Sequence, residues 1–244
     1  MSPESLELSV VVPAFNEERR LGTTLEKIAT HLASKAIAHE ILVVDDGSSD
    51  STADIAESFS ERHVQTLCLD RNRGKGAALK RGVLATRGKR VLLTDADLST
   101  PIEELERLEP RLVEAPLVLG SRALPDSKII RHQALHRELM GKTFNKILRL
   151  SGIRGIGDTQ CGFKLLDGDV ARDLFARLVT SGFAFDVELI WLAQRTGLGV
   201  IEVGIEWENS PDSHVGLIVD PPRMLLEILV FRWRHRGLRQ TRSS

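Results

Sequence analysis

The 244-residue sequence is poor in cysteine, is close to neutral in charge and has no long apolar run. Its two cysteines, Cys68 and Cys161, are far apart and match no metal-ligand spacing, so we interpret both as small buried hydrophobic residues. Because nothing suggests a disulfide framework, the composition favours a cytoplasmic protein. The formal net charge of -1 gives no electrostatic reason to expect a nucleic-acid partner.

The segments that direct a chain into or through a membrane are also missing. No stretch approaches the ~18 apolar residues of a membrane-spanning helix. The first apolar run follows Glu4 and Glu7 rather than basic residues, and Pro13 interrupts it, so we expect no signal peptide. There is no internal repeat, low-complexity segment or clear linker. The 42% of hydrophobic residues is enough for one large α/β domain or two small ones.

Short apolar runs alternate with amphipathic segments through the first half of the chain. Continuous apolar runs predict buried strands at 8–12, 41–44, 64–69 and 91–93, with Pro13 ending the first. Helical spacing of apolar residues predicts helices between and after these strands, with Pro101 in the first turn of the fourth. We therefore expect an α/β fold, with a Rossmann-like, mostly parallel sheet and helices on both faces.

The second half is less regular. Gly120, Ser121 and Arg122 end another predicted strand, and residues 132–150 form a predicted basic helix. We expect a glycine-containing loop before residue 160. Three further elements are predicted, namely helices at 170–178 and 185–195 and a strand at 200–203.

Asp95 and Asp97 follow the fourth predicted strand. Residues at i and i+2 face opposite sides of a regular strand, but at a strand end the chain turns and both can approach one ion. Carboxylate oxygens suit Mg²⁺ or Mn²⁺, and such an ion neutralises the charge of a diphosphate leaving group. The alternative interpretation is that both residues shape a turn or cap the helix at Pro101.

Two further polar clusters belong to the same predicted edge of the sheet. The Asp-Asp-Gly-Ser segment at 45–48 is either a turn or a hydrogen-bond acceptor for a nucleobase or ribose. The basic, glycine-containing segment at 71–76 is either a solvated turn or an anion site at a helix N-terminus. Because ligands of parallel sheets bind beyond the carboxyl ends of the strands, we expect these clusters to converge with Asp95 and Asp97.

These motifs occur in a recognisable order. Val-Val-Pro-Ala-Phe-Asn-Glu at 11–17, Val-Val-Asp-Asp-Gly-Ser at 43–48, Asn-Arg-Gly-Lys-Gly at 72–76 and Asp-Ala-Asp at 95–97 resemble the inverting family 2 glycosyltransferases, which have the GT-A fold. The resemblance is strong over about residues 6–125. Asp-Thr-Gln-Cys-Gly-Phe-Lys at 158–164 and several shorter segments are similar to the dolichyl-phosphate glucosyltransferase and mannosyltransferase branch.

The resemblance implies metal-dependent, inverting transfer of a hexose from a nucleotide sugar to a polyprenyl or dolichyl phosphate, with Mg²⁺ or Mn²⁺ as cofactor. Ser99 stands where mannosyl relatives often carry glutamine, which favours glucose from UDP-glucose. Three alternatives stay open. They are mannosyl transfer from GDP-mannose, transfer to a hydroxyl with Asp186 or Glu188 as base, and a non-catalytic nucleotide-binding module.

The resemblance also implies roles for individual residues, with Asp97, Asp95, Arg122 and Arg137 carrying the catalysis. The implied metal ligands are Asp97, Asp95 and Ser99. The implied acceptor contacts are Arg122, Arg131, Arg137 and Lys164. The implied nucleotide-sugar contacts are Pro13, Ala14, Phe15, Glu17, Asp45, Asp46, Lys75, Asp95, Ala96 and Asp97.

An apolar run at 224–233, flanked by arginines, stands near the C-terminus. It is either a core helix or an interfacial helix whose arginines meet anionic lipid. We favour membrane association because a polyprenyl acceptor lies in the bilayer. We therefore expect a GT-A domain at 1–215 and an amphipathic, membrane-associated helix with a basic tail at 216–244, peripheral on the cytoplasmic face of the membrane. The oligomeric state is left open, a homodimer included.

Overall fold

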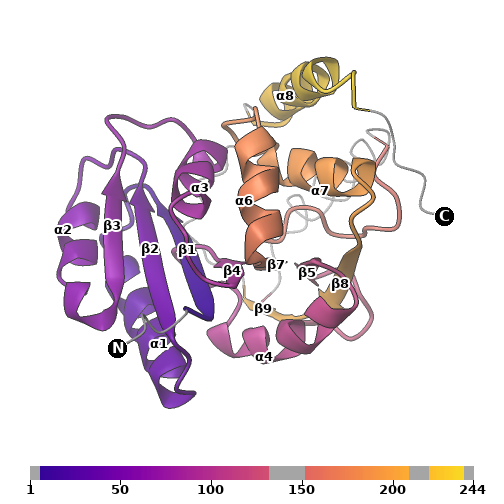
Figure 1. The fold of residues 1–244 in the computed structure, drawn as a ribbon. Helices are drawn as coiled ribbons and strands as arrows, with labels where there is room; N and C mark the ends of the chain where they lie inside the picture. The colour runs from indigo at the N-terminus through magenta and orange to yellow at the C-terminus, as the bar shows by residue number, and fades with distance from the viewer. Residues whose placement is uncertain (1–5, 132–151, 209–219, 239–244) are drawn as a thin grey trace.

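The computed structural model describes residues 6–131, 152–208 and 220–238. Its centre is a seven-stranded sheet in the order β3-β2-β1-β4-β7-β5-β8 (Figure 1). All neighbouring strands pair in parallel except β7, which is antiparallel to β4 and β5. The strands are β1 (Leu8–Ala14), β2 (His39–Asp45), β3 (Val64–Cys68), β4 (Arg90–Leu93), β5 (Leu117–Ser121), β7 (Lys164–Asp167) and β8 (Val200–Gly204).

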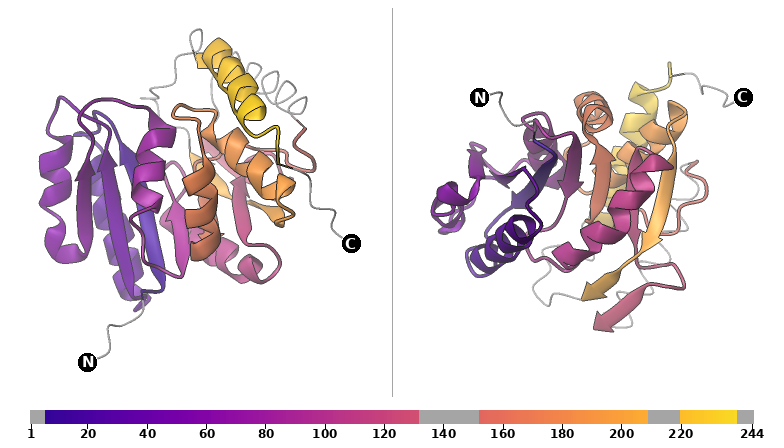
Figure 2. Two further views of the ribbon diagram at one scale, coloured as in Figure 1. Left: turned by 45° about the horizontal axis from the view of Figure 1, so that its top comes forward. Right: turned by 60° about the horizontal axis from the view of Figure 1, so that its bottom comes forward.

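Helices cover both faces of this sheet, as predicted (Figure 2). Alternate side chains of each strand enter two apolar layers, so that Val10 and Val12 face one layer and Val11 faces the other. The layer of Val10 packs against α1, α2 and α4, and the layer of Val11 packs against α3, α6, α7 and α8. The helices are α1 (Leu21–Ser34), α2 (Thr52–Glu57), α3 (Lys75–Val83), α4 (Leu105–Leu108), α6 (Gly168–Arg177), α7 (Phe185–Arg195) and α8 (Asp220–Arg234).

The strand order places one position of the sheet in a special environment. The chain runs outward from β1 through β2 to β3 and then returns to place β4 on the other side of β1. The connections that follow β1 and β4 therefore run toward opposite edges of the sheet. This arrangement leaves a crevice beyond the carboxyl ends of the two strands. The segments after β1, β2 and β4 carry the polar clusters that the sequence predicts to converge.

Pro13 does not end the first strand, contrary to the sequence prediction, because β1 continues to Ala14. The backbone groups of Val11 face β4, where the Thr94 N–H donates to the Val11 carbonyl, and those of Ala14 face β2. Pro13 shares the orientation of Val11, and pairing with β4 has ended by that point. The missing backbone N–H of Pro13 therefore removes no hydrogen bond between strands, and β1 can continue past it.

Other departures are local. The helix predicted after Pro101 is a 3₁₀ turn (Ile102–Glu104), the short α4 and a second 3₁₀ turn (Glu109–Val113). Cys68 is exposed rather than buried, since it ends the edge strand β3, whereas Cys161 is buried as predicted. A small parallel pair of strands, β6 (Lys128–Arg131) and β9 (Glu206–Glu208), was not predicted. The predicted helix at 132–150 lies outside the described residues.

Helix α8 packs on the domain with one face and leaves another apolar face exposed. Met224, Ile228 and Phe231 are buried in the layer of α3, α6 and α7. No described helix is both long enough and apolar enough to cross a bilayer. The exposed apolar side chains of α8 are Leu225, Leu226, Leu229, Val230 and Trp233.

Candidate active site

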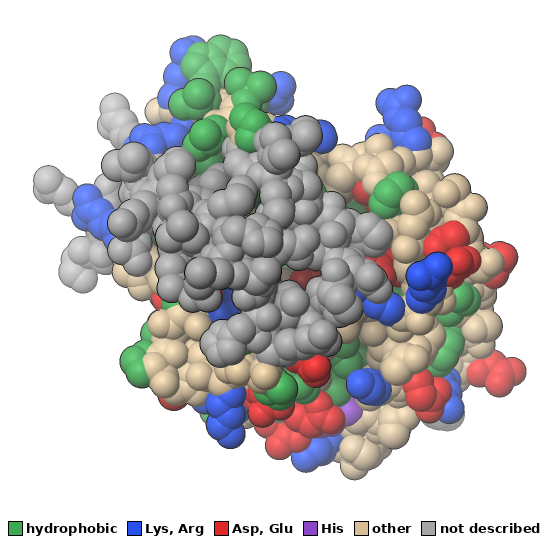
Figure 3. All heavy atoms as spheres, turned by 180° about the vertical axis from the view of Figure 1, so that it is seen from behind, with side chains coloured by type: hydrophobic (Ala, Val, Ile, Leu, Met, Phe, Trp, Pro, Cys, Tyr) green, Lys and Arg blue, Asp and Glu red, His purple; other side chains and the backbone are tan. Residues whose placement is uncertain are grey.

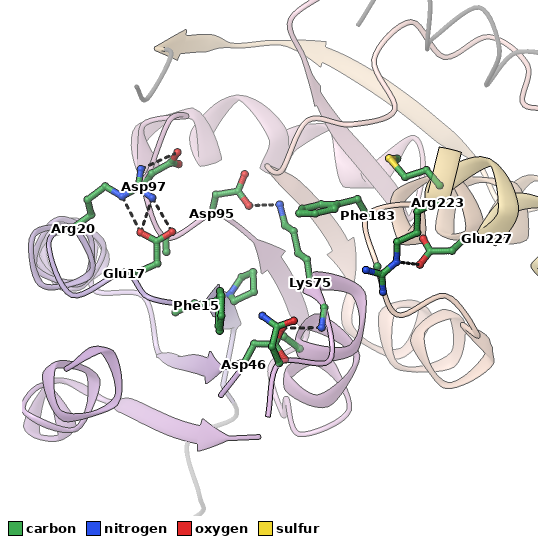
Figure 4. Close-up of a pocket in the computed structure, with 18 residues that line it drawn as sticks. Phe15, Glu17, Arg20, Asp46, Lys75, Asp95, Asp97, Phe183, Arg223 and Glu227 are labelled. Atoms are coloured by element: carbon green, nitrogen blue, oxygen red, sulfur yellow. Dashed lines mark hydrogen bonds and ion pairs between the residues drawn. The ribbon is translucent and has the colours of Figure 1, made fainter. Parts of the chain in front are cut away.

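A cavity of about 390 Å³ opens beyond the carboxyl ends of β1, β2 and β4 (Figure 4). Of the ten residues implied as nucleotide-sugar contacts, all but Asp45 line this cavity. They are far apart in the sequence and converge because they follow strands that end at the same edge of the sheet. Asp45 lies behind the wall, where its carboxylate accepts hydrogen bonds from the N–H and hydroxyl of Ser48. The nine lining residues are Pro13, Ala14, Phe15, Glu17, Asp46, Lys75, Asp95, Ala96 and Asp97.

Asp95 and Asp97 both face the cavity from the turn that follows β4. This turn is closed by the Leu98 N–H, which donates to the Asp95 carbonyl at 3.1 Å. The Asp97 carboxylate accepts the Ser99 backbone N–H at 3.0 Å, so Ser99 contacts Asp97 through its backbone and does not itself line the cavity. The Asp95 carboxylate lies against Gly162, where a Cβ would be 2.1 Å from Oδ2. Only glycine leaves the room that this carboxylate occupies.

Lys75, at the start of α3, pairs with Asp95 at 2.5 Å between Nζ and Oδ1. Burial acts to raise the pKa of Asp95, but Lys75, together with Lys164 and Arg122, outweighs it and lowers that pKa. Burial likewise acts against the charge of Lys75, and Asp95 and Asp186 raise its pKa nonetheless. Both partners of the pair are therefore ionised at neutral pH.

Asp46 shapes the floor of the cavity. Its two carboxylate oxygens accept the backbone N–H groups of Arg73 and Gly74 at 2.7 and 2.8 Å. Desolvation raises the pKa of Asp46, and these two hydrogen bonds oppose that rise. Gly74 has a φ of 98°, and a Cβ there would lie 2.6 Å from the Ser181 carbonyl oxygen. Asp46 thus holds the turn that starts α3 and also lines the cavity.

Arg20 was not among the residues predicted from the sequence, yet it lines the cavity at the opposite end from α8. Its Nε and Nη2 donate to the two Glu17 oxygens, each at 2.8 Å. A third nitrogen, Nη1, lies 3.9 Å from Asp97 Oδ2. Arg20 therefore joins Glu17 to Asp97, and Glu17 supports the carboxylate pair through it.

Arg122 lies outside the cavity lining, in a bidentate pair with Asp158. Nε and Nη2 donate to Asp158 at 2.6 and 2.8 Å, and the guanidinium lies 5.3 Å above the Trp207 ring centroid. Burial acts to raise the pKa of Asp158, but the charge and hydrogen bonds of Arg122 hold it at about 2. Because Arg122 also lowers the pKa of Asp95, its charge acts on the site.

Lys164 is buried, with a side chain only 1% exposed, and does not line the cavity. Its Nζ donates to Asp186 Oδ1 at 2.5 Å and to the Cys161 carbonyl. Burial raises the pKa of Asp186, although Lys164 and Lys75 act to lower it. The structure therefore gives Lys164 a structural position rather than the acceptor contact expected from the sequence. Arg131 lies in β6, and Arg137 lies outside the described residues.

Glu188 is also engaged. It is fully buried and accepts the Val179 and Thr180 backbone N–H groups at 3.0 and 2.8 Å. Its Oε1 also lies 2.7 Å from His235 Nε2, just beyond α8. Glu188 therefore ties the loop between α6 and α7 to the end of α8. Like Asp186, it is held by structural partners and does not line the cavity.

The two cavity carboxylates fit a Mg²⁺-type ion. Such an ion takes one or two carboxylates, substrate phosphates and water rather than a full protein cage. The described residues contain no group of three or more His, Cys, Asp or Glu side chains that could hold a metal ion. Asp97 and Asp95 would be the ligands. In this structure the Asp95 carboxylate forms its salt bridge with Lys75.

Several lining residues come from segments that the sequence interpretation did not assign to the site. Gly182 and Phe183 belong to the loop before α7, and three others belong to α8. Arg20 could have been found from its i, i+3 spacing to Glu17, but no local signal marks the α8 residues. The additional lining residues are Arg20, Asn72, Gly74, Ala78, Gly182, Phe183, Arg223, Met224 and Glu227.

Asp95 and Asp97 thus lie beyond a parallel strand and face one cavity, and comparison with known proteins shows the family to which the chain belongs. Residues 9–175 match the model described as glycosyl transferase family 2, and the chain belongs to that family. Among its relatives, the dolichyl-phosphate beta-glucosyltransferase of Dictyostelium discoideum is 35% identical, over 95% of this chain and 76% of that protein. The Drosophila melanogaster enzyme of the same name is 39% identical, over 86% and 69%.

Solved structures share the fold. Mannosyl-3-phosphoglycerate synthase from Rubrobacter xylanophilus superposes with a TM-score of 0.68 at 23% identity, covering 98% of this chain and 77% of that one. Glucosyl-3-phosphoglycerate synthase from Mycobacterium tuberculosis, crystallised with Mn²⁺, UDP-glucose and phosphoglyceric acid, gives 0.65 at 20% identity, covering 92% and 79%. At these identities the likeness establishes the mostly parallel α/β fold alone.

Proposed function

We propose that this chain transfers glucose from UDP-glucose to a polyprenyl phosphate of the dolichyl type, with inversion at the anomeric carbon. The observation that carries the proposal is the convergence of Asp95, Asp97 and Lys75 in one cavity beyond β1 and β4. The dolichyl-phosphate beta-glucosyltransferase relatives support the choice of hexose and acceptor.

Each group of the site has a part in this reaction. Asp46 and the end of β1 would hold the nucleoside. Asp95 and Asp97 would hold a divalent metal, which when bound supplies positive charge for the departing diphosphate. Lys75 supplies a positive charge next to Asp95, within reach of the same diphosphate. The family resemblance assigns Arg122 to the acceptor phosphate, whose oxygens a guanidinium suits, and the charge of its pair with Asp158 also acts on Asp95.

The acceptor phosphate attacks without a general base. A phosphate monoester has a second pKa of about 6, so it is largely a dianion at neutral pH. In agreement, the two acidic residues considered as bases, Asp186 and Glu188, are engaged with Lys164 and with backbone N–H groups. Positioning of the two substrates supplies the remaining catalysis.

The outer face of α8 is the surface by which we propose that the protein meets the membrane. Figure 3 shows hydrophobic side chains gathered on α8 with basic side chains beside them. Leu226, Leu229 and Trp233 are each more than 60% exposed, and Arg232 and Arg236 are exposed nearby. An apolar strip bordered by arginines is complementary to an anionic lipid surface.

A transfer assay tests the proposed activity. The protein is incubated with UDP-glucose, UDP-galactose or GDP-mannose and either a polyprenyl phosphate or a free polyprenol, and products are identified by mass spectrometry. We expect β-linked glucosyl phosphate from UDP-glucose with the phosphate acceptor alone. Mannosyl product would favour the GDP-mannose alternative, and glucosylation of the free alcohol would contradict the phosphate acceptor.

Vesicle flotation tests the membrane surface. Replacing Leu226, Leu229 and Trp233 by Ser should abolish flotation with vesicles that contain phosphatidylserine. Val113, in the 3₁₀ turn that follows α4, is 89% exposed and is not part of α8, so Val113→Ser is a control that should float normally. Equal flotation of the triple variant and the control would rule out this surface.

A further inference from the structure

Helix α8 contributes to two surfaces at once. Its outer face is the apolar strip described above, and its inner face lines the donor cavity through Arg223, Met224 and Glu227. Figure 4 places Arg223 and Glu227 across the cavity from Asp97, with the Arg223 guanidinium pointing into it. A single helix therefore connects the proposed membrane surface with the site that binds the nucleotide sugar.

The three cationic side chains that line the cavity differ in their partners. Arg20 is hydrogen-bonded to Glu17, and Lys75 to Asp95. Arg223 makes no hydrogen bond to any residue in the described part of the chain. It forms an ion pair with Glu227, with Nε and Oε1 3.8 Å apart, and its side chain is 64% exposed. Its guanidinium donors are therefore available to a ligand.

Arg223 is nevertheless placed by the fold. One turn further along α8, Glu227 accepts the Ala184 backbone N–H at 3.3 Å. A Cβ at Gly182 would lie 2.4 Å from Glu227 Oε1, so this glycine permits the close approach of α8 to the loop that carries Phe183. The first turn of α8, with Arg223, is thereby fixed at the rim of the cavity.

The cavity lining carries an excess of negative charge, so an anionic substrate needs a positively charged side chain there. Among the residues that the structure describes, the lining holds three cationic side chains against five carboxylates, those of Glu17, Asp46, Asp95, Asp97 and Glu227. A nucleoside diphosphate and a lipid phosphate both add negative charge. Arg20 and Lys75 are hydrogen-bonded to lining carboxylates at 2.8 Å and 2.5 Å, whereas the ion pair of Arg223 with Glu227 is longer, at 3.8 Å. Arg223 is therefore the side chain with most capacity to bind phosphate oxygens, for which its planar fork is suited.

We propose that Arg223 is a phosphate-binding residue of the active site, supplied by the helix whose outer face meets the membrane. The proposal rests on the proposed function, since the phosphate is that of the nucleotide-sugar diphosphate or of the lipid acceptor. Arg223 connects the membrane surface with the donor cavity, because the helix proposed to bind the bilayer also positions the Arg223 guanidinium near the phosphates.

The test compares Arg223→Gln and Arg223→Lys with Arg177→Gln, which removes an exposed arginine of α6 that does not line the cavity. UDP affinity is measured by calorimetry without lipid, and the acceptor KM is measured separately in vesicles. We expect Arg223→Gln to weaken one of the two by about tenfold or more, with partial recovery in Arg223→Lys, because a charge-assisted hydrogen bond is lost. Weaker UDP binding identifies the donor diphosphate, and a raised acceptor KM identifies the lipid phosphate.

Two results would overturn the proposal. One is unchanged UDP affinity and unchanged acceptor KM in Arg223→Gln. The other is an equal effect of Arg177→Gln, which would indicate a general effect of surface charge. The UDP measurement requires no catalysis, so a wild-type protein that binds UDP but forms no glucosyl lipid would refute the proposed function and leave the role of Arg223 to be judged by binding alone.

Discussion

Lys75 and Asp95 form a salt bridge of 2.5 Å at the centre of the cavity, on one of the two carboxylates assigned to the metal. The pair is partly open to solvent, with side chains 22% and 36% exposed. A metal ion held by Asp95 would therefore compete with Lys75 for the same carboxylate oxygen, and a donor diphosphate would give Lys75 an alternative anionic partner. Metal and donor should bind cooperatively for this reason.

Lys75→Met should separate these two effects. Without the lysine, the Asp95 carboxylate is unpaired, so Mn²⁺ should bind more tightly in the absence of nucleotide, while UDP should bind about tenfold more weakly through the loss of a charge-assisted contact. Titration calorimetry with Mn²⁺ alone and then with UDP measures both. If Mn²⁺ affinity falls in the variant, Lys75 does not compete with the metal.

Gly162→Ala tests whether the position of the Asp95 carboxylate matters. The added Cβ would be 2.1 Å from Asp95 Oδ2, and the carboxylate must rotate away because it is the movable partner. We expect transfer to fall by more than about tenfold with a melting temperature close to that of the wild type. The control is Gly157→Ala, whose added Cβ would have its nearest contact at an ordinary 3.4 Å. Gly152→Ala is less suitable, because Gly152 has a φ of 92° that strains any other residue. Full activity of Gly162→Ala would contradict the assigned position of Asp95.

Much of this site could be predicted from the sequence, and the reason is topological. Asp46, Asp95 and Asp97 directly follow apolar strands, and parallel strands end at one edge of a sheet, so local patterns suffice to bring them together. The direction of β7 was not predictable, because a short apolar run has the same composition in either direction. Arg223 and Phe183 were not predictable either, since only the packing of α8 and the loop before α7 brings them to the cavity.

The sequence also placed Lys164 among the acceptor contacts, where the structure shows a buried salt bridge with Asp186. A motif indicates which residue types stand together, but burial depends on what packs over them. Asp186→Asn should therefore reduce the free energy of unfolding by about 3 kcal/mol or more, because it leaves the Lys164 charge buried without its partner. Urea unfolding measures this change.

The same variant distinguishes a structural residue from a general base. If Asp186 is structural, the folded fraction of Asp186→Asn should retain the pH dependence of the wild-type transfer rate. Loss of the alkaline plateau with unchanged stability would instead indicate a base and a hydroxyl acceptor.

The Arg122–Asp158 pair predicts a pH dependence of stability. The folded-state pKa of Asp158 is about 2, below its ordinary value, so the carboxylate stabilises the fold fully above about pH 4 and loses this contribution as the pH falls through 2. The contribution is about 2 kcal/mol. The difference in unfolding free energy between wild type and Asp158→Asn should shrink by this amount between pH 5 and pH 2. A difference that stays constant over that range would show that the pair does not lower the pKa.

The most direct test of the assigned metal site is the rate of glucosyl transfer to polyprenyl phosphate as a function of Mn²⁺, measured for chelator-treated wild type and Asp97→Asn. We predict that the wild type is inactive without metal and recovers as Mn²⁺ is added, and that Asp97→Asn stays at least about a hundredfold slower at saturating metal. Transfer by the wild type in the presence of chelator, or full recovery of Asp97→Asn, would contradict the assignment of Asp95 and Asp97.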